Sequence, residues 1–473
     1  MKILPFRFRE ISKKTLITNE IGDYKIFDKG VVANFFSNSI TKNDKQKLQE
    51  LNILYDENQI WKIASISNQI KKKLERNNSL NYIIAIPTLR CNFSCSYCQV
   101  SRASVNSKGY DWDEEILKRF KNFIKDLNTS YAKIEFQGGE PTIRLDIIED
   151  VIEYCNKLDK EFEFIICTNL SNLNEKFQEI LEYPQVKIST SLDGNELVTS
   201  ANRTNDNEQT KIFFNNLDYI LKKYGPSKIS ALPTITEDLY DKPKELINTY
   251  RKYGFKSIFL RPVNYQGFAR KKFEEISKDY IKWSNFYIKA IDFIREINTK
   301  EYFEEYYLSL LLERIFSSNI KNNYVDFRSP NFIAHDYLVI DYSGKFYPSD
   351  EARMLSRSKH IDLSIGSLKN GLNSSKINNV NFRAMNQVEP DCVHCSYMPY
   401  CGIDLVDDLS RYNRVDVSKS KTWFCNRNID VFDFIFSKII NKEKEWLNLF
   451  LNLIYKSNNH NKTYETFYDR TEI

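Results

Sequence analysis

Three cysteines of this 473-residue chain are spaced as CxxxCxxC, at Cys91, Cys95 and Cys98. Three thiolates can bind three irons of a 4Fe-4S cluster, whereas a purely structural cluster normally takes four cysteines. A set of three therefore leaves one iron open to a ligand that the protein does not supply. A zinc knuckle can use the same spacing, so this segment alone leaves both kinds of site open.

A second group of four cysteines lies near the C-terminus. Its members are Cys392, Cys395, Cys401 and Cys425. Four thiolates form a closed ligand set, which suits either zinc or a complete 4Fe-4S cluster. Taken alone, this group favours zinc. His394 lies inside the CxxC turn, and we expect its ring to point away from the ligands.

The elements around the first cysteines indicate where they lie in the fold. The apolar run 82–87 is rich in β-branched residues and ends in Pro87, which is typical of a buried strand. Strands are predicted at 82–87, 131–137, 162–168, 186–192, 228–235 and 256–261. Helices are predicted between them at 112–127, 145–158, 173–183, 208–223 and 240–253. This alternation predicts an α/β fold with a parallel sheet curved into a partial barrel, whose strand ends carry the chemistry.

Polar residues follow successive strands of this predicted sheet. The second strand is followed by Gly138-Gly-Glu-Pro141. Glycines there let the backbone approach a ligand closely, and Glu140 offers a carboxylate to a cation. Further polar residues come after the third and fourth strands: Thr168, Asn169, Ser191, Asp193 and Arg203.

The cysteine motif after a first strand, with Gly138-Gly-Glu-Pro141 after a second, resembles the radical S-adenosylmethionine (SAM) enzymes. The resemblance implies a six-stranded partial (β/α)6 barrel. It also implies that the amino and carboxylate groups of SAM bind the open iron. An electron from the reduced cluster would then cleave SAM to methionine and a 5′-deoxyadenosyl radical, which abstracts hydrogen from a substrate.

The same resemblance implies a role for each polar residue. The residues expected to contact SAM are Tyr97, Gly138, Gly139, Glu140, Asn169, Ser191, Asp193, Arg203 and Val263. Glycines and Glu140 would bind the amino group, Ser191 and Asp193 the ribose, and Arg203 the carboxylate. The backbone of Tyr97, and the side chain of Val263, would lie beside adenine. Each of three residues also has an alternative role: Asn169 could cap a loop, Arg203 could be a surface charge, and Val263 could pack in the core.

The second cysteine group resembles the SPASM domain of peptide-modifying radical SAM enzymes. That domain usually holds two auxiliary clusters, and this chain keeps all four cysteines of one. At the other, Leu405 and Ser349 stand where the family has cysteines. Asp350 follows the vacant position, where some SPASM enzymes use an aspartate to take a proton from the substrate radical. A carboxylate paired with Arg353 is the alternative.

Residues 1–78 are predicted to form a separate N-terminal unit. A hairpin around Glu20-Ile-Gly22 precedes small helices and a basic amphipathic helix over 62–76. This arrangement is similar to the winged-helix peptide-recognition elements of ribosomal peptide systems, in which a leader peptide adds a strand to a sheet edge. A structural cap on the barrel is the alternative. The other predicted parts are a core and helical linker at 79–330, a SPASM-like domain at 331–430 and a C-terminal helix and tail at 431–473.

Short segments over most of the chain resemble the His-Xaa-Ser system radical SAM maturases. They are 4–9, 18–22, 87–90, 99–103 and 347–354. The resemblance implies a gene-encoded precursor peptide as substrate and a second radical SAM maturase working beside this one. The expected cofactors are SAM and two 4Fe-4S clusters, with flavodoxin or ferredoxin as electron donor.

Composition narrows the remaining choices. Lys and Arg number 68 against 63 Asp and Glu, a net charge of +5, so no dominant basic patch is predicted and nucleic acid is not an expected partner. No apolar run approaches a membrane span and the N-terminus lacks a signal-peptide pattern, so we expect a cytoplasmic protein without a membrane partner. Two competing interpretations remain: a radical SAM enzyme acting on RNA or a small metabolite, and a zinc-bearing binding scaffold.

Overall fold

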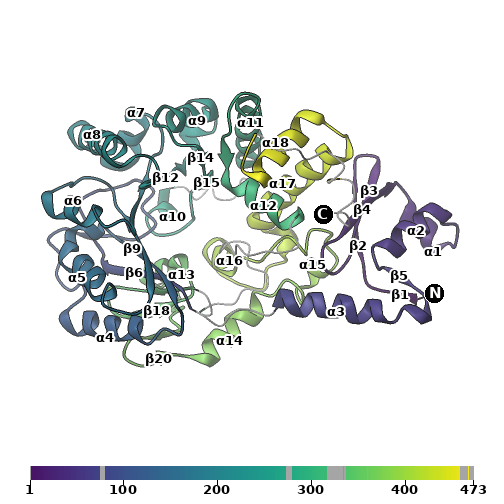
Figure 1. The fold of residues 1–473 in the computed structure, drawn as a ribbon, viewed down its shortest axis with the longest axis horizontal. Coiled ribbons are helices and arrows are strands. Elements are labelled where there is room, and N and C mark those ends of the chain that lie inside the picture. The colour runs from purple at the N-terminus through teal and green to yellow at the C-terminus, as the bar shows by residue number, and fades with distance from the viewer. Residues whose placement is uncertain are drawn as a thin grey trace.

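The computed structural model describes residues 2–74, 80–272, 280–316, 334, 337–359, 361–458 and 467. Figure 1 shows three regions along the longest axis. A strand-and-helix region lies at one end, a helical region with the C-terminal cysteine segment lies in the middle, and a small N-terminal unit lies at the other end. No helix within these described ranges is long and apolar enough to cross a membrane.

A parallel sheet forms the centre of the first region. Its strands, in spatial order, are β12 (Ile229–Leu232), β11 (Val186–Ser191), β10 (Glu161–Cys167), β9 (Tyr131–Gly138) and β6 (Tyr82–Thr88). The crossover helices are α4 (Glu114–Lys125), α5 (Leu145–Cys155), α6 (Glu175–Leu181), α8 (Asn207–Tyr224) and α9 (Pro243–Lys252). The predicted α/β alternation is confirmed, with most boundaries shifted by a few residues.

Alternating burial on β9 shows why these strands form a sheet with two different faces. Ala132, Ile134 and Phe136 are fully buried on the face that packs in the main apolar core, which includes residues of α4 and α5. Burying the side chains of Ile134 and Phe136 stabilises the fold by roughly 1.5–3 kcal/mol each. The intervening Glu135 and Gln137 point to the opposite, inner face. The helices therefore cover one face, and the other face is polar on β9, whereas on β6 Ile84 and Ile86 pack in a separate apolar cluster with Val339.

The sixth strand differs from its prediction. The segment predicted at 256–261 forms two short strands, β14 (Ser257–Ile258) and β15 (Arg261–Pro262). β15 pairs in parallel with β13 (Thr234–Ile235), and β14 pairs with β16 (Glu304–Glu305), both outside the main sheet. The prediction of one strand over 228–235 is also wrong, because Pro233 lacks a backbone N–H and separates β12 from β13.

The predicted hairpin around 336–347 is confirmed and extends the barrel sheet. β17 (Tyr337–Ile340) pairs in parallel with β6, and β18 (Lys345–Tyr347) folds back on β17. β19 (Gly366–Ser367) and β20 (Gly371–Leu372) complete a nine-stranded sheet. β18 runs antiparallel to β17 and therefore to β6, so the segment that carries Ser349 and Asp350 leaves the sheet at the end opposite to the one where β6 leads into the first cysteine loop.

Helices fill the middle of the molecule. They are α11 (Tyr280–Asn298), α12 (Tyr306–Phe316), α17 (Trp423–Ile440) and α18 (Lys444–Tyr455). The single helix predicted at 431–454 is wrong, because α17 ends at Ile440 and Lys442 adopts a positive φ of 54° before α18 begins. Most of the tail predicted to be mobile, 458–473, lies outside the described residues. Phe467 is described and packs, almost fully buried, against Phe316 and Phe450.

Shorter elements connect these regions. They are β7 (Arg90–Cys91), β8 (Ala103–Ser104), α7 (Glu196–Thr199), α10 (Ala269–Lys272), α13 (Asp350–Arg357), α14 (Ser374–Arg383), α15 (Pro390–Val393) and α16 (Leu405–Tyr412). The short helical turns are η1 (Glu57–Gln59), η2 (Pro141–Arg144), η3 (Ser200–Thr204), η4 (Glu237–Leu239) and η7 (Lys419–Lys421).

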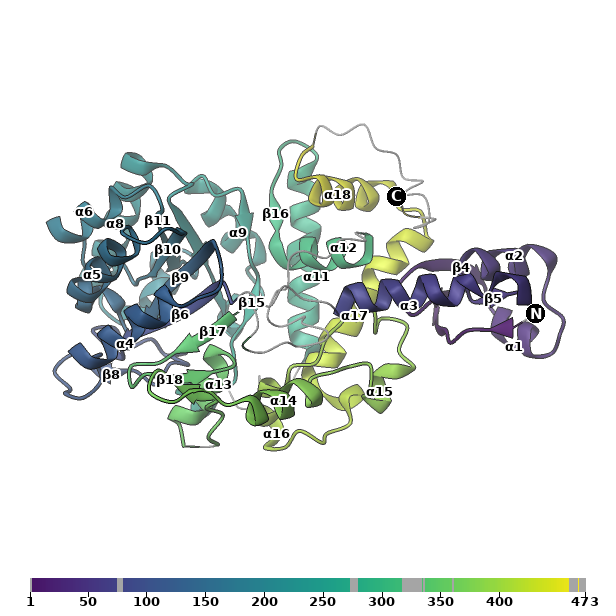
Figure 2. The same cartoon turned by 60° about the horizontal axis from the view of Figure 1, so that its bottom comes forward.

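The N-terminal unit contains the predicted hairpin, formed by β3 (Lys14–Thr18) and β4 (Tyr24–Asp28). A third strand, β2 (Arg7–Ile11), was not predicted, because its charged residues hide the strand pattern. The remaining elements are β1 (Lys2–Ile3), β5 (Leu54–Tyr55), α1 (Val31–Phe36), α2 (Lys42–Glu50) and α3 (Trp61–Leu74). Figure 2 shows α3 running from this unit toward the centre of the molecule. The linker predicted at 77–80 lies outside the described residues except for Leu80.

Candidate functional site

The first cysteine loop begins where β6 ends. Cys91 is the last residue of β7, which pairs with β8, and all three cysteines are half-buried. The loop is fixed by two backbone hydrogen bonds: the Ser96 N–H donates to the Asn202 carbonyl at 2.8 Å, and the Phe268 N–H donates to the Cys98 carbonyl at 2.8 Å. The barrel therefore holds this loop from both sides, after the fourth strand and after the sixth.

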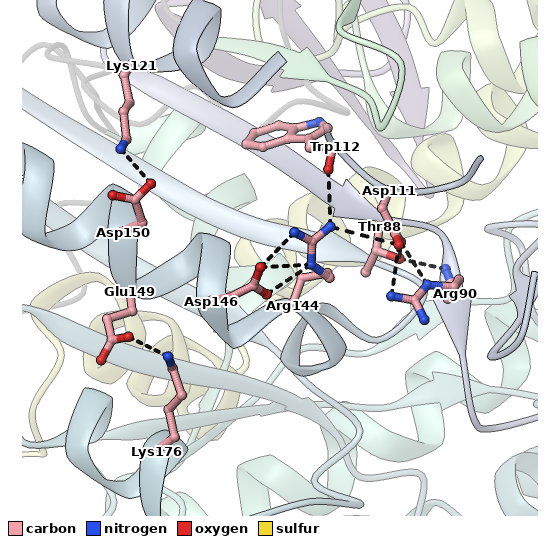
Figure 3. A network of polar contacts seen from close by, with 10 residues as sticks. All are labelled: Thr88, Arg90, Asp111, Trp112, Lys121, Arg144, Asp146, Glu149, Asp150 and Lys176. Carbon is pink, nitrogen blue, oxygen red and sulfur yellow. Dashed lines mark hydrogen bonds and ion pairs between the residues drawn. The ribbon is translucent and has the colours of Figure 1, made fainter. Parts of the chain in front are cut away.

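A polar network ties the start of this loop to the segment after β9 (Figure 3). The Asp111 carboxylate accepts hydrogen bonds from Thr88 Oγ1 at 2.5 Å and from Arg90 Nε at 2.8 Å. Arg144 lies 3.8 Å from the other Asp111 oxygen and donates to the Trp112 carbonyl at 3.1 Å. Thr88 and Arg90 flank the turn into Cys91, while Arg144 ends η2. The network therefore sets the position of the cysteines relative to Glu140, at the start of η2.

Two glycines bring β9 against this same turn. A Cβ atom on Gly138 would lie 2.1 Å from the Thr88 carbonyl oxygen, and one on Gly139 would lie 2.3 Å from that of Arg90. Gly138 also has a φ of +147°, which side chains rarely adopt. The close approach that these glycines permit in the structure is to the backbone leading into Cys91. Their contribution to a ligand site is therefore to bring Glu140 next to the cysteine loop.

Glu140 is almost fully buried at the end of β9, with 1% of its surface exposed. Its Oε1 atom accepts hydrogen bonds from Thr142 Oγ1 at 2.6 Å and Thr168 Oγ1 at 2.7 Å, and Oε2 accepts one from the Asn169 N–H at 2.7 Å. Burial nevertheless raises the pKa of Glu140 above its usual value. A cation placed beside Oε2 would favour the ionised form, because a carboxylate oxygen can accept more than one donor.

Arg203 lies on the π-helical turn η3, beside the cysteine loop, and only 6% of its surface is exposed. It bonds to the Ser191 carbonyl and interacts with the Cys95 thiol. Its Nε is buried and has no hydrogen-bond partner within the described part of the chain. Arg203 is therefore a buried cation with a donor to spare next to a cysteine, and a surface charge is the wrong interpretation of this residue.

Asp193 is completely buried after β11. Oδ2 accepts a 2.6 Å hydrogen bond from the Tyr97 hydroxyl, and Oδ1 accepts one from the Thr234 N–H at 2.9 Å. Burial raises the pKa of Asp193 above its usual value. In this structure the carboxylate holds Tyr97, and thus the segment between Cys95 and Cys98, against the barrel.

The other predicted SAM contacts are less closely gathered. Asn169 Nδ2 donates to Asn92 Oδ1 at 2.9 Å and lies 3.9 Å from Cys91 Sγ, so it contacts the cysteine loop from the segment after β10. Ser191 is half-buried and contacts Arg203 through its carbonyl. Val263 follows β15, is half-buried, and donates its N–H to the Ile235 carbonyl at 3.3 Å.

The thiols of this loop are in surroundings that oppose ionisation. Burial and the neighbouring Glu140 carboxylate raise the pKa of Cys91 to about 12, and burial raises the pKa of Cys95. Metal ligation requires thiolates, so a bound cationic centre would have to displace these protons. Among the described residues, no three His, Cys, Asp or Glu side chains converge as the ligands of a single metal ion do. Each thiolate of a 4Fe-4S cluster binds a different iron, so these sulfur atoms lie farther apart than the ligands of a single metal ion.

The second cysteine group lines one cavity of about 270 Å³. Its four thiols come from α15, the following loop and the first turn of α17: Cys392, Cys395, Cys401 and Cys425. Burial and repulsion from the neighbouring Cys401 and Cys395 raise the pKa of Cys425 to about 12, and burial raises the pKa of Cys401 to about 11. Asn428 Nδ2 lies 3.8 Å from Cys401 Sγ. Exposed His394 also borders the cavity. The structure thus places the four predicted thiols around one cavity, although they do not converge as the ligands of a single metal ion do.

The positions where a second auxiliary cluster would need ligands have other roles. Ser349 is the N-cap of α13, where its Oγ accepts the Ala352 N–H at 3.0 Å. Leu405 is buried in a small apolar cluster with Ala384 and Ile403. A helix cap and an apolar side chain offer no thiolate.

Asp350 is the first residue of α13, and its side chain is 15% exposed. Its Oδ1 accepts a 2.7 Å hydrogen bond from Arg353 Nε, so the alternative pairing with Arg353 is present in the structure. Arg353 is 2% exposed, and its NH1 and NH2 have no hydrogen-bond partner within the described residues. A paired carboxylate can still accept a proton, so a role for Asp350 as base stays a prediction.

Several residues of this site were missed by sequence reasoning. They are Thr88, Arg90, Asp111, Thr142, Arg144 and Asn202. Three of the six, Arg90, Thr142 and Asn202, directly adjoin residues that the motifs singled out. Gly267 was also missed. It has a φ of +55°, and a Cβ atom there would lie 2.2 Å from the Gln99 carbonyl oxygen, so this position beside the cysteine loop requires glycine. The glycine itself was the signal in the sequence.

Residues 85–279 match the family model of the radical SAM superfamily. The match starts in β6 and covers the cysteine loop and the parallel strands that follow. It shows a radical SAM domain over this part of the chain.

Two curated relatives match part of the chain. An uncharacterised protein of Methanocaldococcus jannaschii is 28% identical over 184 residues, which is 38% of this chain and 62% of that protein. GTP 3′,8-cyclase of Aliarcobacter butzleri is 23% identical over 230 residues, 47% of this chain and 58% of that enzyme. The chain thus spans about three fifths of the length of these two relatives.

A solved structure of native anSMEcpe, with bound AdoMet and Cp18Cys peptide, has the same fold. Its TM-score is 0.58 at 18% identity, over 76% of this chain and 98% of that one. At this identity the likeness shows the fold alone, which is the α/β radical SAM fold predicted from the sequence.

Proposed function

We propose that this chain is a cytoplasmic radical SAM enzyme that modifies a ribosomally synthesised precursor peptide. One observation carries the first half of the proposal: buried Glu140 and buried Arg203 flank the loop of Cys91, Cys95 and Cys98 at the carboxyl ends of the strands. A carboxylate and a guanidinium with an unbonded Nε are the groups needed to hold the amino and carboxylate ends of one amino acid moiety.

The residues of the site fit SAM and a 4Fe-4S cluster. Cys91, Cys95 and Cys98 would hold the cluster, which when reduced would supply the electron for SAM cleavage. Glu140 would bind the amino group through Oε2, and Arg203 would bind the carboxylate through Nε. Asp193 would act by holding Tyr97 and its backbone in place. Ser191, Asn169 and Val263 would complete the SAM pocket, and Asp350 would accept a proton from the substrate.

The four-thiol cavity would hold one auxiliary 4Fe-4S cluster within a SPASM-like domain over 331–430. Its closed set of four thiolates leaves no iron open. A flavodoxin or ferredoxin would supply electrons, and a second radical SAM maturase would act beside this chain, as in the His-Xaa-Ser systems.

The peptide substrate is supported by a groove in the winged-helix-like unit at 1–78. The groove has a volume of about 260 Å³ and is lined mostly by apolar side chains and by the turn between β3 and β4: Leu4, Pro5, Asn19, Glu20, Asn52, Ile63, Ile66, Ser67, Ile70 and Lys71. An extended apolar stretch of a leader peptide would bury its side chains there, against α3. The peptide in the anSMEcpe structure is in line with such a substrate for this fold.

Mass spectrometry of a precursor peptide encoded beside this chain tests the proposal. Co-expressed with the enzyme, the peptide should change in mass, and it should stay unchanged with the Cys91→Ala variant. An unchanged peptide beside an enzyme that still cleaves SAM would reject the peptide and favour a small metabolite, the substrate class of the GTP 3′,8-cyclase relatives.

The Ile70→Asp variant tests whether the groove binds the leader. Ile70 lines the groove on α3, whereas its neighbour Gln69 is exposed and does not. Burying an isoleucine contributes roughly 1.5–3 kcal/mol, so Ile70→Asp should weaken peptide binding at least about tenfold. Gln69→Asp adds the same charge and should bind like the wild type. Equal affinities of both variants by calorimetric titration would leave the N-terminal unit as a structural cap.

A further inference from the structure

The inner face of strand β2 carries two arginines at positions that strands usually fill with apolar side chains. Burial alternates along β2, so that Arg7, Arg9 and Ile11 share the face toward the middle of the molecule. Arg7 is 6% exposed, and the Arg9 side chain is 35% exposed. Burying a guanidinium is costly unless it is paired and hydrogen-bonded, so the partners of these two side chains indicate their purpose.

Arg7 joins the N-terminal sheet to the loop of the second cysteine group. Its Nε donates a 2.7 Å hydrogen bond to the carbonyl of Val393, which lies between Cys392 and Cys395. Its NH2 pairs with Glu20 at 3.1 Å. Its NH1 is buried and has no hydrogen-bond partner in the described part of the chain. Arg7 thus fixes the backbone of the CxxC turn and retains one unused donor.

Arg9 reaches the wall of the four-thiol cavity. It binds both carboxylate oxygens of Asp433 at 2.6 Å, a planar two-point contact that an arginine makes and a lysine cannot. Tyr397, two residues after Cys395, donates its hydroxyl to the same Asp433 at 2.5 Å, and the Arg9 guanidinium lies 5.5 Å from the Tyr397 ring centre. Arg9 itself lines the cavity.

Two further hydrogen bonds join the same sheet to the same loop. Thr18 Oγ1 donates to the Ser396 carbonyl at 3.0 Å, and the Tyr400 hydroxyl donates to the Gly22 carbonyl at 2.6 Å. Figure 1 shows α15, which carries Cys392, next to β2. The segment from Val393 to Tyr400 is therefore held at several points by side chains or backbone of the N-terminal sheet.

We propose that β2 completes the second metal centre, with Arg7 and Arg9 as positioning residues for the Cys392–Cys395 loop. The proposal rests on the proposed auxiliary cluster for the identity of the group bound. Two guanidinium groups beside an anionic cluster stabilise its reduced form, and so raise its reduction potential. The N-terminal sheet is then part of the redox site as well as of the peptide-binding unit, since Glu20 both pairs with Arg7 and lines the leader groove.

The alternative is that these contacts merely dock the N-terminal unit on the core. If the arginines only dock the N-terminal unit, replacing them should lower the thermal stability. It should leave the alkylation rates of the cysteines and the potential of the second cluster unchanged. Lys14 provides a matched control, because it forms an exposed ion pair with Asp28 at 2.6 Å on the same sheet. The variants to compare are Arg7→Gln, Arg9→Gln, Arg7→Lys and Lys14→Gln.

Thiol alkylation of the metal-free protein is the first test. Iodoacetamide labelling followed by peptide mass spectrometry should show Cys392 and Cys395 reacting several-fold faster in Arg7→Gln and Arg9→Gln than in the wild type. The rates of Cys91, Cys95 and Cys98 should be the same in all variants, and Lys14→Gln should match the wild type. Arg7→Lys should restore only part of the protection, because lysine keeps the charge but loses the fork.

Redox titration of the reconstituted protein is the second test. The signal from the second cluster should move to a more negative potential in Arg9→Gln, while the SAM-binding cluster keeps its potential. Unchanged labelling rates together with an unchanged potential would overturn the proposal. Arg9 is one-third exposed, so Arg9→Gln provides the test if Arg7→Gln does not fold. If the wild-type second site binds zinc, the auxiliary cluster is wrong, and the labelling rates still decide the role of the arginines.

Discussion

Replacing Cys91, Cys95 and Cys98 together by alanine is expected to abolish the formation of 5′-deoxyadenosine from SAM. The three thiols share one loop, held by Asn202, Phe268 and the Asp111 network, and they are the proposed ligand set, which would leave an iron open for SAM. The loss should be complete to the detection limit of chromatography, because no other three-cysteine set adjoins Glu140.

The matched control for this variant is its own iron content. Iron at the second site should remain, because Cys392, Cys395, Cys401 and Cys425 lie in a separate cavity. Undiminished SAM cleavage by the triple variant would contradict the assignment. Loss of all iron together with a lower melting temperature would point to misfolding, and single replacements of each cysteine would then be compared.

Replacing Cys392 and Cys395 by alanine is expected to remove about half of the bound iron. The wild type should hold about eight irons, from two clusters of four, and the variant about four. The remaining cluster should keep its response to SAM. The physical reason is that a closed set of four thiolates loses its cluster once two of them are gone.

Two results would contradict this second prediction. About twelve irons in the reconstituted wild type would require a third cluster with ligands other than thiolates, since Ser349 caps α13 and Leu405 is buried among apolar side chains. Stoichiometric zinc at the second site would replace the auxiliary cluster by a structural metal. Metal analysis of the same preparation distinguishes the two.

The parallel sheet and its loops could be predicted from the sequence because local pattern and global fold agree there. On β9, apolar and polar residues alternate with a period of two, and glycines follow where the strand ends. The helices between the strands have apolar stripes and capping residues such as Asp113 and Asn174. Cysteine spacing then located the candidate site without any knowledge of distances.

What the sequence could not show depends on contacts between distant segments. Strand β2 was not predicted because Arg7 and Arg9 make its sequence charged. The partners that allow these arginines to lie on a strand, Val393 and Asp433, are far along the chain. The Asp111 network was missed for the same reason, since its members are separated by loops of different length. The glycines of Gly138-Gly139 were expected to approach a ligand, and the structure brings them against the backbone before Cys91.

Breaks in regular structure were the other source of error. Proline separates β12 from β13 at Pro233, the residues Phe259 and Leu260 separate β14 from β15, and a residue with positive φ, Lys442, divides the C-terminal helix.

The central claim is that the first cysteine loop holds a cluster to which SAM binds through an open iron. Electron paramagnetic resonance of the anaerobically reconstituted, dithionite-reduced Cys392→Ala/Cys395→Ala variant tests it most directly, because only the first cluster then contributes. Addition of SAM is predicted to change the spectrum of the reduced cluster, and 5′-deoxyadenosine and methionine should then form in equal amounts. A spectrum that SAM leaves unchanged, with no 5′-deoxyadenosine formed by protein that holds about four irons, would contradict the claim.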